Sequence, residues 1–296
     1  MILATAALET KKRRRHSPGG GELFVTRSTL VTIQPGSGSK RPLFCVHAEA
    51  GDVSLYYGIA RHLAADRPLL GLCAPAADGL DAHRRLERMA KHHVREIKSA
   101  QPEGPYLIVG ECTGGALAYE IAQQLRAAGQ EIALLALVDA FPPGLPRLHS
   151  SMPRPLYRIL HRSRILGFHA ANLVRLGMRE KLAYAASKAQ RARRALRAKS
   201  YRVLGRTAAS VSPQLAFREA LATYDAAPYA GSMVLFRAAR MPLGIHASPD
   251  LGWAGLVADL EVETIPGYFT TPISEPGVRV LADRLSAHLG ERAGQA

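Results

Sequence analysis

From Pro42 onward the chain alternates short apolar runs with longer amphipathic stretches. Short runs rich in branched and aromatic residues predict buried strands, and apolar residues spaced three and four apart predict helices. The predicted strands cover residues 43–46, 69–72, 106–109, 134–138, 233–237 and 262–265. Helices are expected between them, most clearly at 86–99 and at 115–128, where Gly129 is the expected C-terminal cap. This alternation predicts an α/β fold with a mostly parallel sheet flanked by helices.

Two segments depart from the alternation. Residues 1–40 carry a basic run at 11–15 and glycine clusters, so we expect a flexible N-terminal extension with room for a short strand within 23–33. A basic tract at about 146–212 has helical apolar spacing and separates two predicted strands, which predicts a helical lid inserted late in the fold. We therefore expect one domain at 41–292 that includes this lid.

The net charge of +15 is concentrated in the lid tract. Between Arg147 and Arg206 there are sixteen Lys or Arg residues and one acid, Glu180, so the excess in this tract equals the net charge of the whole chain. Two interpretations stay open: helices with solvated basic faces, or a basic surface that docks an acidic partner. Nucleic acid is a weaker candidate because no base-reading motif accompanies the charge.

Cysteine usage and hydropathy indicate a reducing, aqueous environment. The three cysteines, Cys45, Cys73 and Cys112, are an odd number without short spacing, so neither a disulfide framework nor a zinc site is predicted. No run of about 18 apolar residues and no N-terminal signal sequence is recognisable. We expect a cytoplasmic protein with no membrane contact and no metal.

The strongest chemical signal is Gly110-Glu-Cys112-Thr-Gly114, which joins a predicted strand to a predicted helix. This pattern is a G-x-S-x-G nucleophile elbow with cysteine in the serine position, as in an α/β-hydrolase fold. The N-terminal end of the helix is expected to lower the pKa of a thiol there. We therefore predict Cys112 as the nucleophile, with a merely packed cysteine as the alternative.

Two further segments complete the candidate constellation. The loop after the first strand, 46–51, is expected to supply an oxyanion donor, and the backbone N–H groups of Glu49 and Thr113 are the candidates. His47 in this loop is interpreted as a structural residue. Asp139 ends a predicted strand, where it is either the acid of a catalytic triad or a cap for the next turn.

At these residues the sequence resembles the thioesterase domains and stand-alone thioesterases of nonribosomal peptide and polyketide assembly lines. The resemblance extends from Pro42 to Leu289. Its motifs are Leu43-Phe-Cys-Val-His47, Gln101-Pro-Glu-Gly-Pro-Tyr106, the elbow, Val138-Asp139, Pro228-Tyr-Ala-Gly231, Phe236-Arg-Ala238, Gly252-Trp253, Ile265-Pro-Gly267 and Glu275-Pro276.

The resemblance implies an α/β-hydrolase fold and assigns Asp139, 27 residues after Cys112, as the triad acid. It implies an acyl substrate carried as a thioester on the phosphopantetheine arm of a carrier protein, with no separately bound cofactor. Carrier proteins of this kind are acidic, so the basic lid is expected to dock one.

The chain departs from the family where the general base should stand. The family has a histidine in a Pro-Gly-x-His-aromatic setting, but this chain reads Pro266-Gly267-Tyr268-Phe269-Thr270. The histidine position falls on Phe269 without a gap and on Tyr268 with a one-residue gap. Neither is a base near neutral pH. His246 is either a substitute or a surface residue.

A missing base predicts poor hydrolysis, because a cysteine is nucleophilic without a base but an attacking water is not. The first hypothesis is therefore an acyltransferase or cyclase of secondary-metabolite and antibiotic biosynthesis that forms an acyl-enzyme on Cys112. Cysteine-type shuttles that move aminoacyl groups between carrier proteins are a close variant. A hydrolytic editing thioesterase is the third enzymatic alternative, and a non-catalytic carrier-protein-binding homologue is the alternative from another class.

Overall fold

The computed structural model describes residues 28–75, 85–146, 148–175, 177, 213–245 and 247–293. Its centre is a seven-stranded sheet with the strand order β1-β3-β2-β4-β5-β6-β7. Only β1 runs antiparallel to its neighbour, β3, and the other five pairs are parallel. The strands are β1 (Leu30–Gln34), β2 (Leu43–Val46), β3 (Leu69–Leu72), β4 (Tyr106–Glu111), β5 (Ile132–Val138), β6 (Tyr229–Arg240) and β7 (Val257–Tyr268).

The mostly parallel sheet and all six predicted strands are confirmed. β2 and β3 have the predicted bounds, whereas β6 and β7 are twelve residues each, much longer than expected. β1 belongs to the sheet although it lies inside the expected N-terminal extension. Residues 1–27 of that extension lie outside the described residues, and its boundary at residue 41 stays a prediction.

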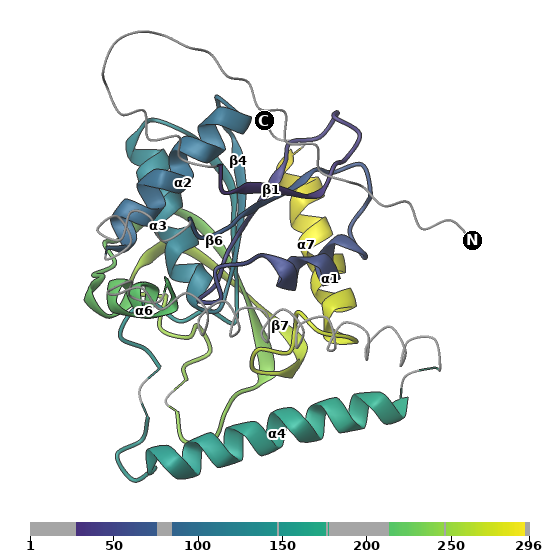
Figure 1. The fold of residues 1–296 in the computed structure, drawn as a ribbon, viewed down its shortest axis with the longest axis vertical. Helices are drawn as coiled ribbons and strands as arrows, with labels where there is room; N and C mark the ends of the chain where they lie inside the picture. The colour runs from purple at the N-terminus through teal and green to yellow at the C-terminus, as the bar shows by residue number, and fades with distance from the viewer. Residues whose placement is uncertain are drawn as a thin grey trace, which may run out of the picture.

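Helices cover both faces of the sheet, as Figure 1 shows. One layer holds α2 (Leu86–Ala100), α3 (Thr113–Ala127) and α6 (Pro213–Thr223). The other holds the short η1 (Ser54–Tyr56), α1 (Tyr57–Ala60) and α7 (Gly277–Ala293). Each layer buries its own apolar cluster against the sheet. α3 ends as predicted, because Gly129 has a φ of +73° and the Gln130 N–H donates to the Leu125 carbonyl.

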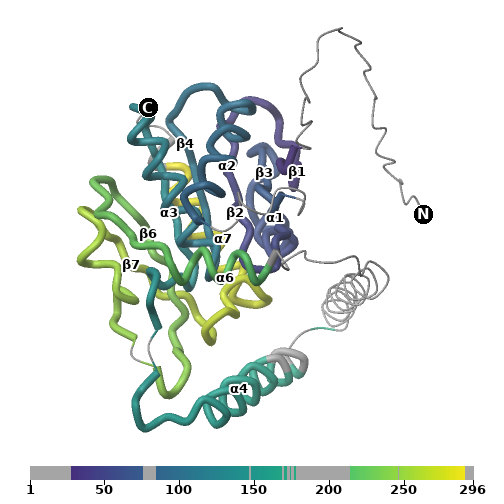
Figure 2. Tube along the Cα trace, turned by 60° about the vertical axis from the view of Figure 1, so that its left-hand side comes forward, coloured from purple at the N-terminus to yellow at the C-terminus, as the bar shows by residue number. Residues whose placement is uncertain are grey.

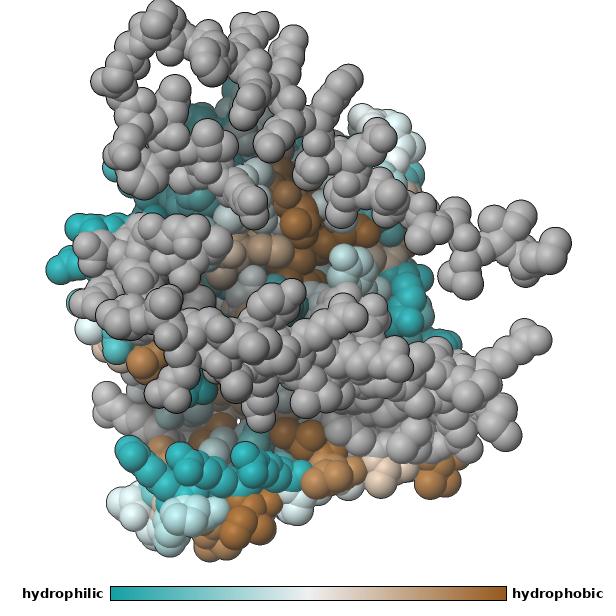
Figure 3. All heavy atoms as spheres, in the orientation of Figure 1, coloured by the Kyte–Doolittle hydropathy of each residue, from teal (hydrophilic) through white to brown (hydrophobic). Residues whose placement is uncertain are grey.

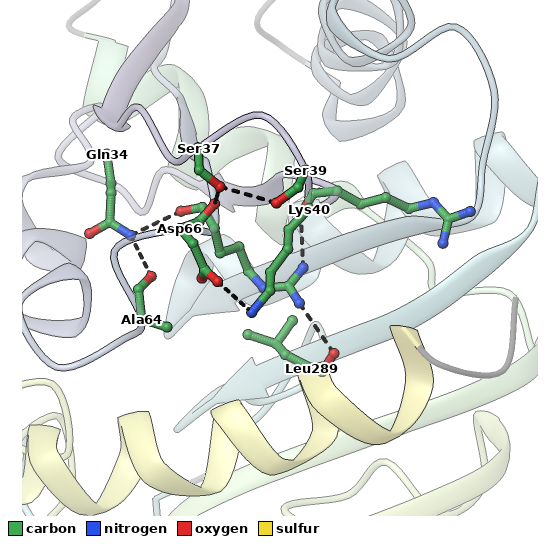
Figure 4. Close-up of polar contacts among 9 residues, drawn as sticks. Gln34, Ser37, Ser39, Lys40, Ala64, Asp66 and Leu289 are labelled. Carbon is green, nitrogen blue, oxygen red and sulfur yellow. Dashed lines mark hydrogen bonds and ion pairs between the residues drawn. The ribbon is translucent and has the colours of Figure 1, made fainter.

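Polar contacts connect the loops at the amino-terminal ends of β2 and β3 (Figure 4). The Gln34 amide donates to the Ala64 carbonyl at 2.9 Å, and Lys40 pairs with Asp66 at 2.9 Å. Arg67 donates to the Leu289 carbonyl near the end of α7. These bonds connect the loops before β2 and β3 to each other and to α7. They lie at the opposite ends of the strands from the candidate site.

The carboxyl ends of the parallel strands lie together on the other side of the molecule, which is where α/β folds place functional groups. His47, Cys112, Asp139 and the segment 269–271 all follow strand ends there. Helix α4 (Arg154–Arg175) lies beyond these strand ends, apart from the layers around the sheet (Figures 1 and 2). It lies within the tract expected to form a lid, of which residues 147, 176 and 178–212 lie outside the described residues. None of the described helices is long and apolar enough to cross a membrane.

Candidate active site

Cys112 occupies a strained turn between β4 and α3. Its backbone has a φ of +51° and a ψ of −122°, a conformation that residues other than glycine seldom adopt. The turn is held on both sides, since the Cys112 N–H donates to the Val138 carbonyl at 2.9 Å and the Gly115 N–H donates to the Cys112 carbonyl at 3.0 Å. This backbone is the nucleophile elbow that the sequence predicts.

The glycines around Cys112 are required by close backbone approach. A Cβ atom at Gly110 would lie 2.7 Å from the Ala118 Cβ, and one at Gly114 would lie 2.6 Å from the His47 carbonyl oxygen. A Cβ atom at Gly115 would overlap the Cβ of Ala140. Side chains at these positions would push α3 away from β2, β4 and β5 and would displace the turn.

The environment of the Cys112 thiol differs from the sequence expectation. Burial raises its pKa, and the Glu111, Asp139 and Glu49 carboxylates raise it further, while the Thr113 N–H opposes them. The expected lowering of the pKa by the helix terminus is therefore wrong for this structure, because desolvation and three carboxylates outweigh it. Cys112 is a protonated thiol at neutral pH.

We expect Cys112 to react slowly with iodoacetamide at pH 7 and progressively faster as the pH rises beyond 9, because only the thiolate is alkylated. The rate is measured by intact mass, with Cys112→Ala as the control that separates Cys112 from Cys45 and Cys73. A plateau that begins below pH 8 would instead indicate an activated thiolate.

The two predicted oxyanion donors are brought together. The Glu49 N–H donates to the Thr113 hydroxyl at 3.0 Å, which links the loop after β2 to the first residue of α3. The Glu49 carboxylate pairs with Arg218 of α6 at 2.7 Å. A substrate carbonyl oxygen entering between the two backbone N–H groups would replace the Thr113 hydroxyl as the acceptor of the Glu49 N–H.

Asp139 connects three strand ends. It follows β5, its side chain is fully buried, and its two oxygens accept hydrogen bonds from the Ala238 N–H at 2.6 Å and the Thr270 N–H at 2.7 Å. Burial raises its pKa to about 6, although the two bonds oppose the shift. The carboxyl group thus holds β6 and the segment after β7 against the end of β5. Its role as a triad acid stays a prediction.

Asp139 should make stability fall as the pH rises from about 4 to about 6. Its pKa in the folded chain, about 6, lies above the ordinary value of 3.8, so the unfolded chain ionises first and folding is disfavoured by about 3 kcal/mol above pH 6. Asp139→Asn removes this term. Urea unfolding of both proteins at several pH values should show their stability difference change across this window, and a constant difference would contradict the assignment.

The segment expected to carry the general base carries an aromatic cluster instead. The Tyr268 hydroxyl lies 3.0 Å from Nδ1 of His161 on α4. The Phe269 ring lies 5.7 Å from the ring of Phe141 and 6.4 Å from that of His161. Burial lowers the pKa of His161, so it is neutral at pH 7. The alternative base, His246, lies outside the described residues.

His161 was not predicted from the sequence. No local motif marks it, and its approach to Tyr268 joins residues 107 positions apart. The described residues also bring Glu261, Glu263 and His288 within metal-binding distance of one another. His288 and Arg284 both pair with Glu263, which accounts for this group without a metal.

Comparisons with known proteins identify a family that matches this chain. The thioesterase domain family model matches residues 41–240. A dimodular nonribosomal peptide synthase of Bacillus subtilis is 35% identical over 124 residues, which cover 41% of this chain and 5% of that protein. Enterobactin synthase component F of Escherichia coli is 32% identical over 116 residues, which cover 39% of this chain and 9% of that protein. The chain thus spans a small part of these relatives.

Solved structures show the same fold at low identity. The NocB thioesterase domain in a covalent complex with a fluorophosphonate nocardicin G analog has a TM-score of 0.58 and 24% identity, with 88% of this chain and 99% of that one covered. The Vlm2 thioesterase domain has a TM-score of 0.53 and 20% identity, with 89% and 99% covered.

Proposed function

Because the chain belongs to the thioesterase domain family, we propose that it takes an acyl group from a carrier-protein thioester onto Cys112 and releases it by transfer or cyclisation. The observation that carries the proposal is the strained backbone of Cys112 at the elbow, beside the paired Glu49 and Thr113. The nonribosomal peptide synthase among its relatives supports a role in the biosynthesis of peptide secondary metabolites, and the polyketide alternative rests on the resemblance alone.

Acylation exchanges one thioester for another. The Cys112 sulfur attacks the carbonyl carbon, the carbonyl oxygen becomes negatively charged between the Glu49 and Thr113 N–H groups, and the pantetheine sulfur leaves with the proton of the Cys112 thiol. Release forms a bond between the acyl carbon and an acceptor and breaks the bond between the acyl carbon and the Cys112 sulfur. The departing sulfur takes up the proton that an amine acceptor loses, or a proton from water when the acceptor is a thiolate or a carbanion. Since Phe269 or Tyr268 stands where the resemblance places the base, an acceptor that is already nucleophilic, such as an amine, a thiolate or a stabilised carbanion, fits this site better than water.

The carrier protein is proposed to dock at α4. This helix contains five arginines and no acidic residue, and Arg154, Arg158, Arg162 and Arg164 are exposed. Apolar side chains such as Ile159 and Leu166 also reach the surface of α4. Figure 3 shows hydrophilic and hydrophobic atoms next to one another at this end of the molecule. An acidic carrier would complement this charge and bring its phosphopantetheine arm to the edge of the sheet that holds Cys112.

A non-catalytic carrier-binding protein is the second candidate. The raised pKa of Cys112 and the aromatic residues at the expected base position favour it. One relative, 33% identical over 120 residues, is named an inactive atromentin synthetase. A hydrolytic editing thioesterase fits less well, because hydrolysis needs a base to deprotonate water.

Intact-protein mass spectrometry tests the proposal. Wild type and Cys112→Ala are mixed with acyl-pantetheine thioesters and with acyl carrier protein, and the adduct is then followed in water and with added amine or thiol acceptors. We expect an adduct of the acyl mass on wild type only, stable in water and discharged by an acceptor. An adduct that water removes rapidly would favour the editing enzyme, and carrier binding without any adduct would favour the non-catalytic homologue.

A further inference from the structure

The peptide group between Ala48 and Glu49 is fixed by three hydrogen bonds. The Ala48 carbonyl accepts from Nδ1 of His47 at 2.8 Å and from the Gly51 N–H at 2.9 Å. The Glu49 N–H donates to the Thr113 hydroxyl at 3.0 Å. In a trans peptide the C=O and the N–H point in opposite directions, so bonds that hold the carbonyl also aim the N–H. The His47 ring therefore helps to determine where the proposed oxyanion donor points.

The bond from His47 also defines its tautomer. A carbonyl oxygen only accepts hydrogen bonds, so Nδ1 must carry the hydrogen in this contact. The ring is a donor to the loop in its neutral form and stays one when protonated. Its effect on the Ala48 carbonyl consequently does not depend on the charge of the ring.

Two helices hold the His47 ring in place. The side chain is 1% exposed, and its ring lies 5.4 Å from the ring of His93 on α2 and 5.4 Å from that of Phe217 on α6. The backbone of His47 is equally constrained, since its carbonyl packs against Gly114 of the elbow. A ring confined in this way has little freedom to release the Ala48 carbonyl.

We infer that His47 is a positioning residue for acylation: its ring N–H holds the Ala48 carbonyl so that the Glu49 N–H points toward the developing oxyanion. This inference rests on the proposed function and refines the interpretation of His47 as a purely structural loop residue. Helix α6 takes part through Phe217, which packs on the ring, and through Arg218, which pairs with the Glu49 carboxylate. Because α6 follows the lid tract in the chain, the contacts of His47 and Glu49 with α6 connect the loop after β2 to the segment that follows the expected lid.

The experiment compares two reactions of Cys112 in the whole chain. Acylation by an acyl-pantetheine thioester builds up an oxyanion, whereas alkylation by iodoacetamide does not, so only the first reaction depends on the Glu49 N–H. His47→Phe keeps an aromatic ring but removes the donor. We expect acylation to slow about tenfold, less than the full loss of an oxyanion donor causes, with an unchanged alkylation rate and a similar melting temperature.

His47→Asn is the matched variant, because its side-chain amide nitrogen can take the place of Nδ1 as a donor to the Ala48 carbonyl. It should recover much of the acylation rate even if the smaller side chain lowers stability. Arg218→Ala should slow acylation only about twofold, since an exposed ion pair contributes little. Glu219→Ala, an exposed change on the same helix, is the control.

A His47→Phe variant that acylates at the wild-type rate would overturn the inference. So would a parallel loss of acylation and alkylation, because that result would assign His47 to the access or folding of the site. A wild type that is alkylated at Cys112 but takes up no acyl group would instead overturn the proposed function, and the inference with it.

Discussion

Cys112→Ser is expected to slow acylation by about a hundredfold to ten-thousandfold, although serine is the residue that an elbow of this type ordinarily carries. A serine hydroxyl attacks only when a base removes its proton, and the position that the resemblance assigns to that base holds Phe269 or Tyr268. A thiol is far more acidic than a hydroxyl in the same position, so Cys112 needs less help from a base than a serine would, even though burial raises its pKa. The measurement is the rate of acyl adduct formation from an acyl-pantetheine thioester, followed by intact mass.

Cys112→Ala serves as the blank, and thermal unfolding establishes that the serine variant is folded. The oxygen and sulfur side chains differ little in size, so the elbow should tolerate either. A serine variant that acylates within tenfold of wild type would show that a base acts on residue 112, and that the site needs no cysteine.

Phe269→His should convert the protein into a hydrolase. The Thr270 N–H, from the next residue, donates to Asp139, so the backbone at residue 269 lies close to this carboxyl group. That carboxylate accepts two hydrogen bonds, and a carboxylate has room for more, including one from an imidazole Nδ1–H. We expect hydrolysis of the Cys112 acyl-enzyme to accelerate about a hundredfold, measured as adduct decay in water without any added acceptor.

Tyr268→His distinguishes the two alignments of this segment. The Tyr268 side chain points to His161 on α4, so a histidine there should leave adduct decay unchanged. Phe269→Leu controls for the loss of the aromatic contact with Phe141. Faster decay in the Tyr268→His variant and not in the Phe269→His variant would place the base position at 268.

The sequence predicts the bounds of a strand well where almost every residue of that strand is buried. β2 and β3 are buried on both faces and read as unbroken apolar runs, so their bounds were predicted correctly. β7 was predicted at a third of its length, because it is one of the two edge strands of the described sheet and most of its residues are exposed or half-buried. An edge strand of this kind is defined by its backbone pairing with β6, to which local hydrophobicity is a poor guide.

Only part of the candidate active site can be predicted from the sequence. The elbow is a local motif, and its glycines follow from local crowding, so it was predicted. The sign of the Cys112 pKa shift was not, because it depends on the burial of the thiol and on the Asp139 and Glu49 carboxylates, which the fold brings from other parts of the chain to join the neighbouring Glu111. The bond from Glu49 to Thr113 and the approach of His161 to Tyr268 likewise join distant parts of the chain and have no local signature.

The two hydrogen bonds that Asp139 accepts give this carboxyl group a structural role that is independent of catalysis. Loss of this carboxyl group would leave two backbone N–H groups without an acceptor and would release the ends of three strands, at a cost of about 1–3 kcal/mol for each group. Folding alone would therefore oppose the substitution of Asp139, whatever reaction the site carries out. An aspartate at this position consequently does not distinguish an active enzyme from a protein that only binds its partner.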